Sequence, residues 1–238
     1  ELLIDIVTSP EGKVSVTDRG IEPTCDDAEK MYGDNGVFDE ASYTDCIKSL
    51  KLDNEVVGIL RTVNSNLADA VGDYGTEVLF GRDYYNEELL GLKFKVSIFS
   101  FFQTNIRAIE RLYEQALSFI PGIDGKVVYD LYCGTGTISQ LASPRAKEVY
   151  GIEIVEEAVQ SAIANTKLNG IDNCHYLCGD VKEKLSELDV SPDVIIVDPP
   201  RAGLHDKMVR MLAEYGVPEI LYISCNPKTM AMNLEQFR

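Results

Sequence analysis

Between residues 126 and 223, short apolar runs alternate with longer segments of helical spacing, and no other feature of the sequence constrains the fold as strongly. The apolar runs predict strands at 126–130, 148–152, 173–177, 193–197 and 219–223. The intervening segments predict helices at 137–142, 156–169 and 206–215. Because strands that alternate with helices are joined by right-handed crossovers, this region should form an open, doubly wound α/β domain with a parallel sheet.

The chain before this region shows a different pattern. It predicts strands at 2–7, 56–60 and 77–80, a turn at 9–12 with a returning strand at 13–17, and a helix at 39–50. We interpret residues 1–91 as a small α+β domain without a chemical motif. The second domain, residues 92–238, then begins with a strand at 92–96 and a helix at 105–119, whose apolar residues share one face.

The composition is that of an ordinary globular protein, with 45% hydrophobic and 26% charged residues. No apolar run reaches the roughly 18 residues that a membrane helix needs, so we expect a soluble, cytoplasmic protein. The six cysteines are scattered and include no CxxC pair. This pattern disfavours both a disulfide framework and a metal site.

The strand at 126–130 runs into a glycine-rich turn, DLYCGTGT, at residues 130–137. Glycines let the backbone approach a ligand closely, and the helix that follows offers free N–H groups at its N-terminus. The dinucleotide fingerprint GxGxxG would need a third glycine at position 139, which is Ser139. A nicotinamide cofactor is therefore disfavoured.

Acidic residues also stand at the ends of the next two strands. Glu153 ends the second strand, where a carboxylate can accept hydrogen bonds from a ribose diol. Asp180 follows the third strand, where it can meet an adenine amino group. Each acid by itself is more often a helix cap or a solvated loop residue. Together with Asp130 they stand at three successive strand ends, and ligands of such sheets bind outside these ends.

The last two predicted strands end in sequences that suggest chemistry. The fourth is followed by DPPR at 198–201, whose two prolines form a rigid turn that can hold Asp198 against a ligand. The fifth is followed by SCNP at 224–227, which places a thiol beside the same crevice. A lone cysteine is more often inert packing, but beside DPPR we interpret Cys225 as a candidate nucleophile.

Together these motifs resemble the RNA uridine-5 methyltransferase family, whose members make 5-methyluridine in tRNA and 23S rRNA. The resemblance extends from about residue 56 to the end of the chain. It rests on the stretches GLKFKVSIFSFFQTN, VVYDLYCGTGTIS, VYGIEIVEEAV, DVIIVDPPRAGL and LYISCNPKT. DPPR followed by SCNP separates this family from related methyltransferases. The resemblance implies a Rossmann-like class I methyltransferase domain that uses S-adenosylmethionine.

The resemblance also implies roles for individual residues. Cys225 matches the nucleophile, whose thiolate adds to carbon-6 of uracil so that carbon-5 can attack the sulfonium methyl group. Asp198 is assigned a catalytic role in addition to a cofactor contact. The residues that match positions around S-adenosylmethionine are Gln103, Tyr132, Gly134, Thr137, Glu153, Asp180 and Asp198.

Three features of the family are missing from these residues. Members often begin with a small RNA-binding β-barrel, and many bacterial members bind an iron–sulfur cluster through four cysteines. Residues 1–92 offer only Cys25 and Cys46, so we expect no iron–sulfur cluster. The family's proton-abstracting glutamate lies in a motif beyond Arg238, and two more strands normally follow the fifth. We therefore expect the sequence to be a fragment that lacks the last strands of its sheet.

The distribution of charge bears on the expected RNA partner. The net charge is −17, of which −13 falls in residues 1–92 and −4 in residues 93–238. Because Lys and Arg contacts to phosphates dominate RNA affinity, the chain alone should bind RNA weakly. We favour 23S rRNA over tRNA as the substrate, and we expect a monomer.

Three other functions stay open at this point. A methyltransferase for exocyclic amines would carry an aromatic residue after Pro-Pro, where this chain has Arg201. A cytosine carbon-5 enzyme would carry a cysteine within residues 198–203, which contain none. A non-catalytic module that binds S-adenosylmethionine or RNA would keep the fold without the chemistry. The intact SCNP sequence favours the uridine-5 enzyme over all three.

Overall fold

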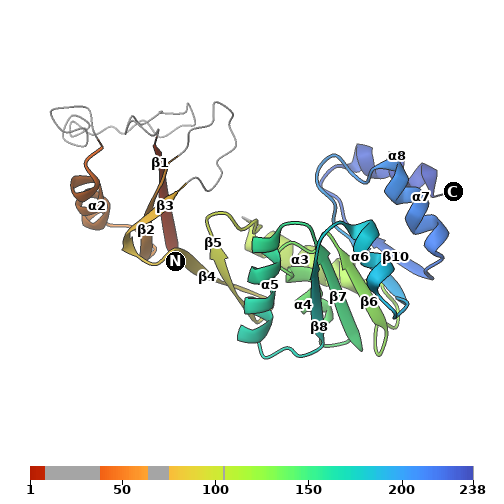
Figure 1. The fold of residues 1–238 in the computed structure, drawn as a ribbon. Coiled ribbons are helices and arrows are strands. Elements are labelled where there is room, and N and C mark those ends of the chain that lie inside the picture. Colours follow the sequence, from red (N-terminus) through yellow and green to blue (C-terminus); the bar gives the residue numbers. More distant parts are fainter. Residues whose placement is uncertain (9–37, 64–74, 104, 238) are drawn as a thin grey trace. The chain divides into compact units, whose positions relative to one another are not determined.

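The computed structural model describes residues 1–8, 38–63, 75–103 and 105–237 (Figure 1). The chain divides into two compact units, of which one comprises Glu1–Glu87 with Lys95–Phe99 and the other Glu88–Phe94 with Ser100–Arg238. A hairpin of β4 (Tyr84–Leu89) and β5 (Leu92–Ser97) supplies residues to both units. The boundary that we placed after residue 91 stays a prediction.

The first unit is built on a three-stranded sheet in the order β1 (Leu2–Thr8), β2 (Val56–Val63) and β3 (Thr76–Gly81). β1 runs parallel to β2, and β2 runs antiparallel to β3. Helix α2 (Glu40–Ser49) begins after Asp39, which accepts a hydrogen bond from the Ser42 N–H at 3.0 Å. The three strands and the helix predicted for this region are confirmed. The turn at 9–12 and the strand at 13–17 lie outside the described residues.

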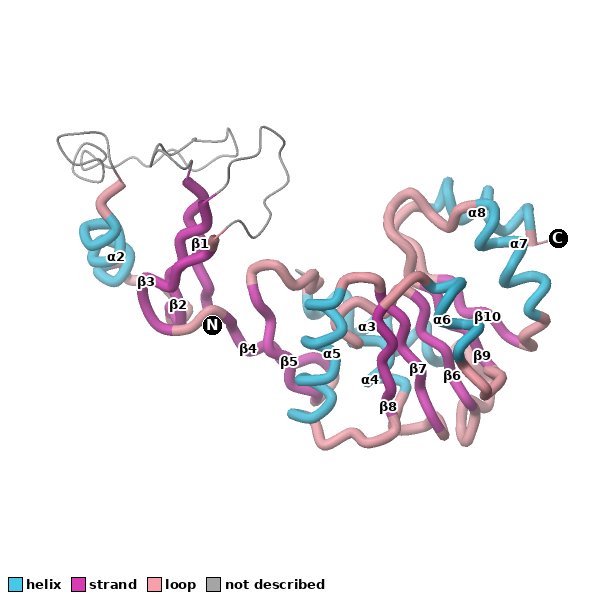
Figure 2. The backbone as a smooth tube through the Cα atoms, in the orientation of Figure 1, coloured by secondary structure: helices cyan, strands magenta, loops and turns pink. Residues whose placement is uncertain are grey.

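The second unit contains a sheet of five parallel strands (Figure 2). They are β6 (Val127–Leu131), β7 (Glu148–Glu153), β8 (Cys174–Cys178), β9 (Val194–Val197) and β10 (Glu219–Tyr222). Their order in the sheet is β10-β9-β6-β7-β8, so the chain builds outward from β6 and then returns to place β9 beside it. The boundary between β6 and β9 is therefore a switch point, the place where such sheets bind ligands. The α/β prediction is confirmed.

Six helices of the described residues accompany this sheet: α3 (Ile106–Ser118), α4 (Thr137–Ala142), α5 (Glu156–Leu168), α6 (Val181–Glu187), α7 (Asp206–Tyr215) and α8 (Pro227–Gln236). Apolar side chains of α6 and α7 share one core with β6 and β9, whereas α4 and α5 pack on the opposite face (Figure 1). The sequence predicted α3, α4, α5 and α7 but missed α6 and α8. Both missed helices begin with a side-chain cap, at Asp180 and Asn226, which is the signal that could have revealed them.

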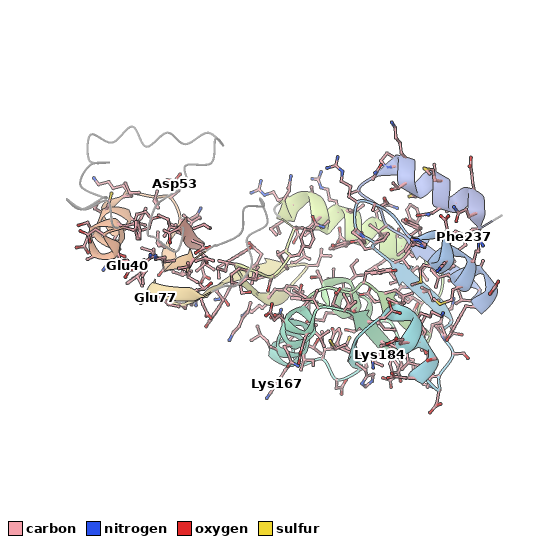
Figure 3. The ribbon with its side chains drawn as sticks, turned by 45° about the horizontal axis from the view of Figure 1, so that its top comes forward. Glu40, Asp53, Glu77, Lys167, Lys184 and Phe237 are labelled. Atoms are coloured by element: carbon pink, nitrogen blue, oxygen red, sulfur yellow. The ribbon has the colours of Figure 1, made fainter. Side chains whose placement is uncertain are left out.

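Strands β6 and β9 are buried along their whole length, as central strands of a parallel sheet should be. Asp130 is the charged exception within β6. Lys167, at the end of α5, is exposed and points outward (Figure 3). No helix within the described ranges combines the length and the apolar character needed to cross a membrane.

Candidate functional site

A pocket opens in the second unit beside the switch point between β6 and β9. Its walls come from residues 101–103, from α3 and from the glycine-rich loop after β6. Five of the residues predicted to contact a cofactor line it, namely Gln103, Tyr132, Gly134, Thr137 and Asp198. The cavity itself is about 100 Å³, and the space becomes about 540 Å³ when its open, solvent-filled mouth is included.

The loop after β6 has a sharply turned backbone. Tyr132, Gly134 and Gly136 have φ angles of 67°, 53° and 72°, and the left-handed region is uncommon for a residue such as Tyr132. A Cβ on Gly134 would meet no atom within 4 Å, whereas a Cβ on Gly136 would lie 2.5 Å from the Tyr176 hydroxyl. Gly134 thus leaves room for a ligand, and Gly136 is required by packing.

Glu153, at the end of β7, is bound to the main chain. Its Oε2 accepts a hydrogen bond from the Gly134 N–H at 3.1 Å. Its Oε1 accepts from the N–H groups of Ile154 and Val155 at 2.8 and 3.0 Å. This carboxylate therefore fixes the turn after β7 against the glycine-rich loop. Since a carboxylate offers about four acceptor positions, ligand hydroxyls can bind to it as well.

Asp180 lies outside the residues that line the pocket and caps α6. Its Oδ1 accepts from the N–H groups of Lys182 and Glu183 at 2.9 and 3.4 Å. Its carboxylate still acts on Tyr132, which lines the pocket. The pKa of Tyr132 is raised first by burial and then by the Asp180 carboxylate. The two interpretations of this acid, helix cap and ligand contact, are compatible.

Asp130 is completely buried beneath the glycine-rich loop. Its Oδ2 accepts a hydrogen bond from the Ser139 hydroxyl at 2.6 Å, and its Oδ1 has no partner among the described residues. Burial raises the pKa of Asp130 to about 7, with a further contribution from the nearby Asp198 carboxylate. Near neutral pH this carboxyl therefore exists in both protonation states.

Asp198 follows β9 and is half-buried at the edge of the pocket. Burial raises the pKa of Asp198 to about 6. Tyr113 of α3 lines the same pocket. Burial and then the Asp198 carboxylate raise the pKa of Tyr113, while a hydrogen bond with Gln103 opposes this effect. The sequence places Tyr113 only on the apolar face of a helix. Its hydroxyl, which is polar, is the feature that could have marked it as a residue of the site.

Cys225 carries an exposed thiol in the turn between β10 and α8 and is not among the residues that line the pocket. β10 pairs in parallel with β9, and Ile223 donates its N–H to the Val197 carbonyl at 2.9 Å. The Asn226 amide donates to the Arg201 carbonyl at 3.1 Å. The loops that carry Asp198 and Cys225 therefore lie side by side.

The other described cysteines differ from Cys225 in burial or position. Burial raises the pKa of Cys133 well above its usual value and that of Cys174 to about 12, so both thiols should be inert. Cys178 is exposed at the end of β8. No group of three or more His, Cys, Asp or Glu within the described ranges is placed to hold a metal. Cys25 lies outside these ranges, and the absence of an iron–sulfur cluster stays a prediction.

The parallel sheet and the glycine-rich loop after its central strand define the Rossmann-like methyltransferase fold. A solved structure of this class is similar to the chain: tRNA (uracil-54, C5)-methyltransferase from Pyrococcus abyssi, in complex with S-adenosyl-L-homocysteine. The two share 30% identity with a TM-score of 0.66, over 77% of this chain and 45% of that one.

The sequence model of the tRNA (Uracil-5-)-methyltransferase family matches residues 69–238, and the chain belongs to this family. An uncharacterized RNA methyltransferase of Clostridium acetobutylicum is 48% identical, over 84% of this chain and 44% of the relative. Another, of Caldanaerobacter subterraneus, is 42% identical over 100% of this chain and 47% of the relative. The family predicted from the motifs is confirmed, and the chain spans a little under half the length of these relatives.

Proposed function

We propose that the protein methylates carbon-5 of a uracil in RNA, with Cys225 as the nucleophile and S-adenosylmethionine as the methyl donor. One observation carries the proposal: the loop of Asp198 lines a pocket at the switch point and is hydrogen-bonded to the loop of Cys225. A methyl donor bound in the pocket and a uracil bound next to Cys225 would then both lie close to Asp198.

The residues of the pocket fit this donor. The open space at Gly134 and the polar side chains of Gln103, Tyr132 and Thr137 suit a ligand with amino, carboxylate and hydroxyl groups. We propose that Glu153 accepts hydrogen bonds from the ribose hydroxyls, which its remaining acceptor positions allow. Asp180 is proposed to use its Oδ2 for the adenine amino group, because only its Oδ1 serves the helix cap.

The chain's own residues supply the nucleophile of the reaction. The Cys225 thiolate forms a bond to carbon-6 of the uracil, and the electron pair of the carbon-5–carbon-6 bond moves to carbon-5. When bound, S-adenosylmethionine would supply an electrophilic methyl group to carbon-5, and the bond from that methyl group to the sulfonium sulfur would break to leave S-adenosylhomocysteine. A base, a role given to no residue of this chain, then accepts the carbon-5 proton. The electron pair of the carbon–hydrogen bond restores the double bond, and the carbon-6–sulfur bond breaks to release the Cys225 thiolate. Asp198 orients the reactants by accepting hydrogen bonds from their N–H groups.

The RNA is proposed to be 23S rRNA, with tRNA as the alternative. The similar protein from Pyrococcus abyssi is named for its action on uracil-54 of tRNA, which supports the alternative. Incubating the full-length protein separately with unmodified 23S rRNA and tRNA, followed by nucleoside mass spectrometry, decides the matter. Formation of 5-methyluridine in tRNA alone would reject 23S rRNA.

The reaction itself is tested by trapping. The full-length protein is incubated with S-adenosylmethionine and RNA that contains 5-fluorouracil, whose fluorine cannot leave as a proton does. A covalent protein–RNA complex should form, should be lost in Cys225→Ala and should persist in Cys178→Ala, the other exposed cysteine of the second unit. Absence of the complex, with cofactor binding retained, would favour the non-catalytic binding module instead.

A further inference from the structure

Helix α8 follows Cys225 and turns a polar residue inward. Asn233 is its buried residue, with a side chain that is 5% exposed. A buried amide is unfavourable unless its hydrogen bonds are satisfied, so a residue of this kind must be bonded within the fold. Phe237, just after α8, packs against the core of the second unit and helps to fix the helix there (Figure 3).

The Asn233 amide joins three elements. Its Oδ1 accepts from the Leu204 N–H and from the Tyr222 hydroxyl, each at 2.9 Å. Its Nδ2 donates to the Leu204 carbonyl, also at 2.9 Å. Leu204 ends the loop that begins at Asp198, and Tyr222 is the last residue of β10. One side chain therefore connects α8 to the loop after β9 and to the strand that precedes Cys225.

The surrounding residues make room for this arrangement and extend it. Gly203 has a φ of 79°, and a Cβ there would lie 2.8 Å from the Asn233 Oδ1. The Thr229 hydroxyl of α8 donates to the Arg201 carbonyl at 3.4 Å, beside the Asn226 bond to the same oxygen. The segments on both sides of Cys225 are thus tied to the loop that carries Asp198.

We propose that Asn233 is a positioning residue that holds the Cys225 turn and the Asp198 loop in one fixed geometry. This inference rests on the proposed function, since it assigns Asn233 a role in the attack of Cys225 on the base. Asn233 does not touch the reactants; it acts through Tyr222 and Leu204. Rates of attack depend steeply on such geometry, because a misplacement of about 1 Å can slow a reaction roughly 100-fold.

Asn169 provides a matched control for a purely structural role. Its Oδ1 accepts from the Lys93 N–H at 2.8 Å, and its Nδ2 donates to the Lys93 carbonyl and to the Gln140 Oε1, each at 2.9 Å. It therefore makes three hydrogen bonds, as Asn233 does, and pairs with both polar groups of one residue. Asn169 caps the C-terminus of α5, which runs antiparallel to the strands. It therefore lies near the amino-terminal ends of the strands, whereas Cys225 lies at their carboxyl ends.

The test compares Asn233→Ala, Tyr222→Phe and Asn169→Ala in the full-length protein. Thermal unfolding is measured first, and the rate of covalent complex formation with 5-fluorouracil RNA is then measured at saturating RNA, well below the lowest unfolding temperature. Asn233→Ala should lose at least as much stability as Asn169→Ala, because the hydrogen bonds of Asn233 to Leu204 are buried and those of Asn169 to Lys93 are exposed. Asn233→Ala should slow complex formation roughly 10- to 100-fold, Tyr222→Phe should slow it less, and Asn169→Ala should leave it unchanged.

Equal rates in Asn233→Ala and Asn169→Ala would overturn the inference while leaving the proposed function intact. If Asn233→Ala does not fold, Tyr222→Phe decides, because it removes one of the three bonds and a wild-type rate would overturn the inference. Absence of a covalent complex in the wild-type protein would instead reject the proposed function, and the inference with it.

Discussion

The two halves of the candidate site hold their polar groups in different ways. The cofactor-side half comprises the loops after β6, β7 and β8. Its carboxylates, Glu153 and Asp180, accept hydrogen bonds from main-chain N–H groups of nearby turns. The nucleophile-side half comprises the loops after β9 and β10. The side-chain amides of Asn226 and Asn233 connect these loops by hydrogen bonds. The Asp198 carboxyl makes no hydrogen bond to a described residue.

This difference indicates which half single substitutions can disturb. Main-chain N–H groups at the ends of parallel strands are set by the sheet itself, so the cofactor-side half is formed as soon as the sheet is. The nucleophile-side half depends on side chains of α8 that reach back to residues up to 29 positions away. Its geometry is therefore open to change by substitutions that leave the sheet intact.

The sharpest test of the comparison replaces one exposed cysteine in each half. Cys225→Ser should lower turnover by at least roughly 10⁴-fold, because removal of a covalent nucleophile abolishes the reaction path. Cys178→Ser, in the cofactor-side half, should retain wild-type turnover. Methyl transfer from labelled S-adenosylmethionine to RNA measures both, and comparable activity of the two variants would remove Cys225 from the mechanism.

The carboxyl of Asp130, within β6 itself, differs from those of Glu153 and Asp180 because it is completely buried and is hydrogen-bonded through Ser139. Its pKa lies above the unfolded value, so the folded state binds the proton more tightly and stability falls as pH rises from about 4 to about 7. The difference corresponds to about 4 kcal/mol. Urea unfolding across this range should show that loss in the wild type and not in Asp130→Asn; parallel profiles would contradict it.

In the nucleophile-side half, Asp198 should link pH to activity as well as to stability. Burial raises its pKa to about 6, so below that pH the carboxyl becomes neutral and can no longer accept as an anion. We expect kcat/KM to fall below pH 6. Asp198→Asn should lower kcat/KM by roughly 100-fold at pH 8 and remove that limb. If kcat/KM of Asp198→Asn still fell below pH 6, the pH dependence would belong to another titratable group.

The smallest expected effect separates two glycines of the cofactor-side loop. Gly136→Ala should destabilise the protein by about 3 kcal/mol, because its Cβ would clash with Tyr176 and Ala162 in addition to the strain of a positive φ. Gly134→Ala, which has open space beside it, should cost about 1 kcal/mol from φ alone. Thermal unfolding measures the difference. Equal losses would mean that the loop is not packed against α5 and β8 as described.

The strand ends illustrate how much of the site the sequence could predict. Four of the five predicted cofactor residues in the pocket follow β6 or β9, because parallel strands place their carboxyl ends at the same edge of a sheet. The fifth, Gln103, precedes α3 and came from the family resemblance alone. Tyr113 escaped prediction, since helical spacing places it among apolar residues and does not reveal what its hydroxyl faces. Asn233 escaped because α8 itself was not predicted, although Asn-Pro at 226–227 is a typical start of a helix.

The sequence by itself determined the five parallel strands and four of the six helices that accompany them, the family, and the residues at each strand end. These follow from periodicity and local motifs, which act over a few neighbouring residues. The tertiary structure decided that Asp130 is buried with a pKa of about 7, that Tyr113 lines the same pocket as Asp198, and that Asn233 connects two loops. Such contacts depend on how helices dock on the sheet, because docking brings together groups that are distant in the chain.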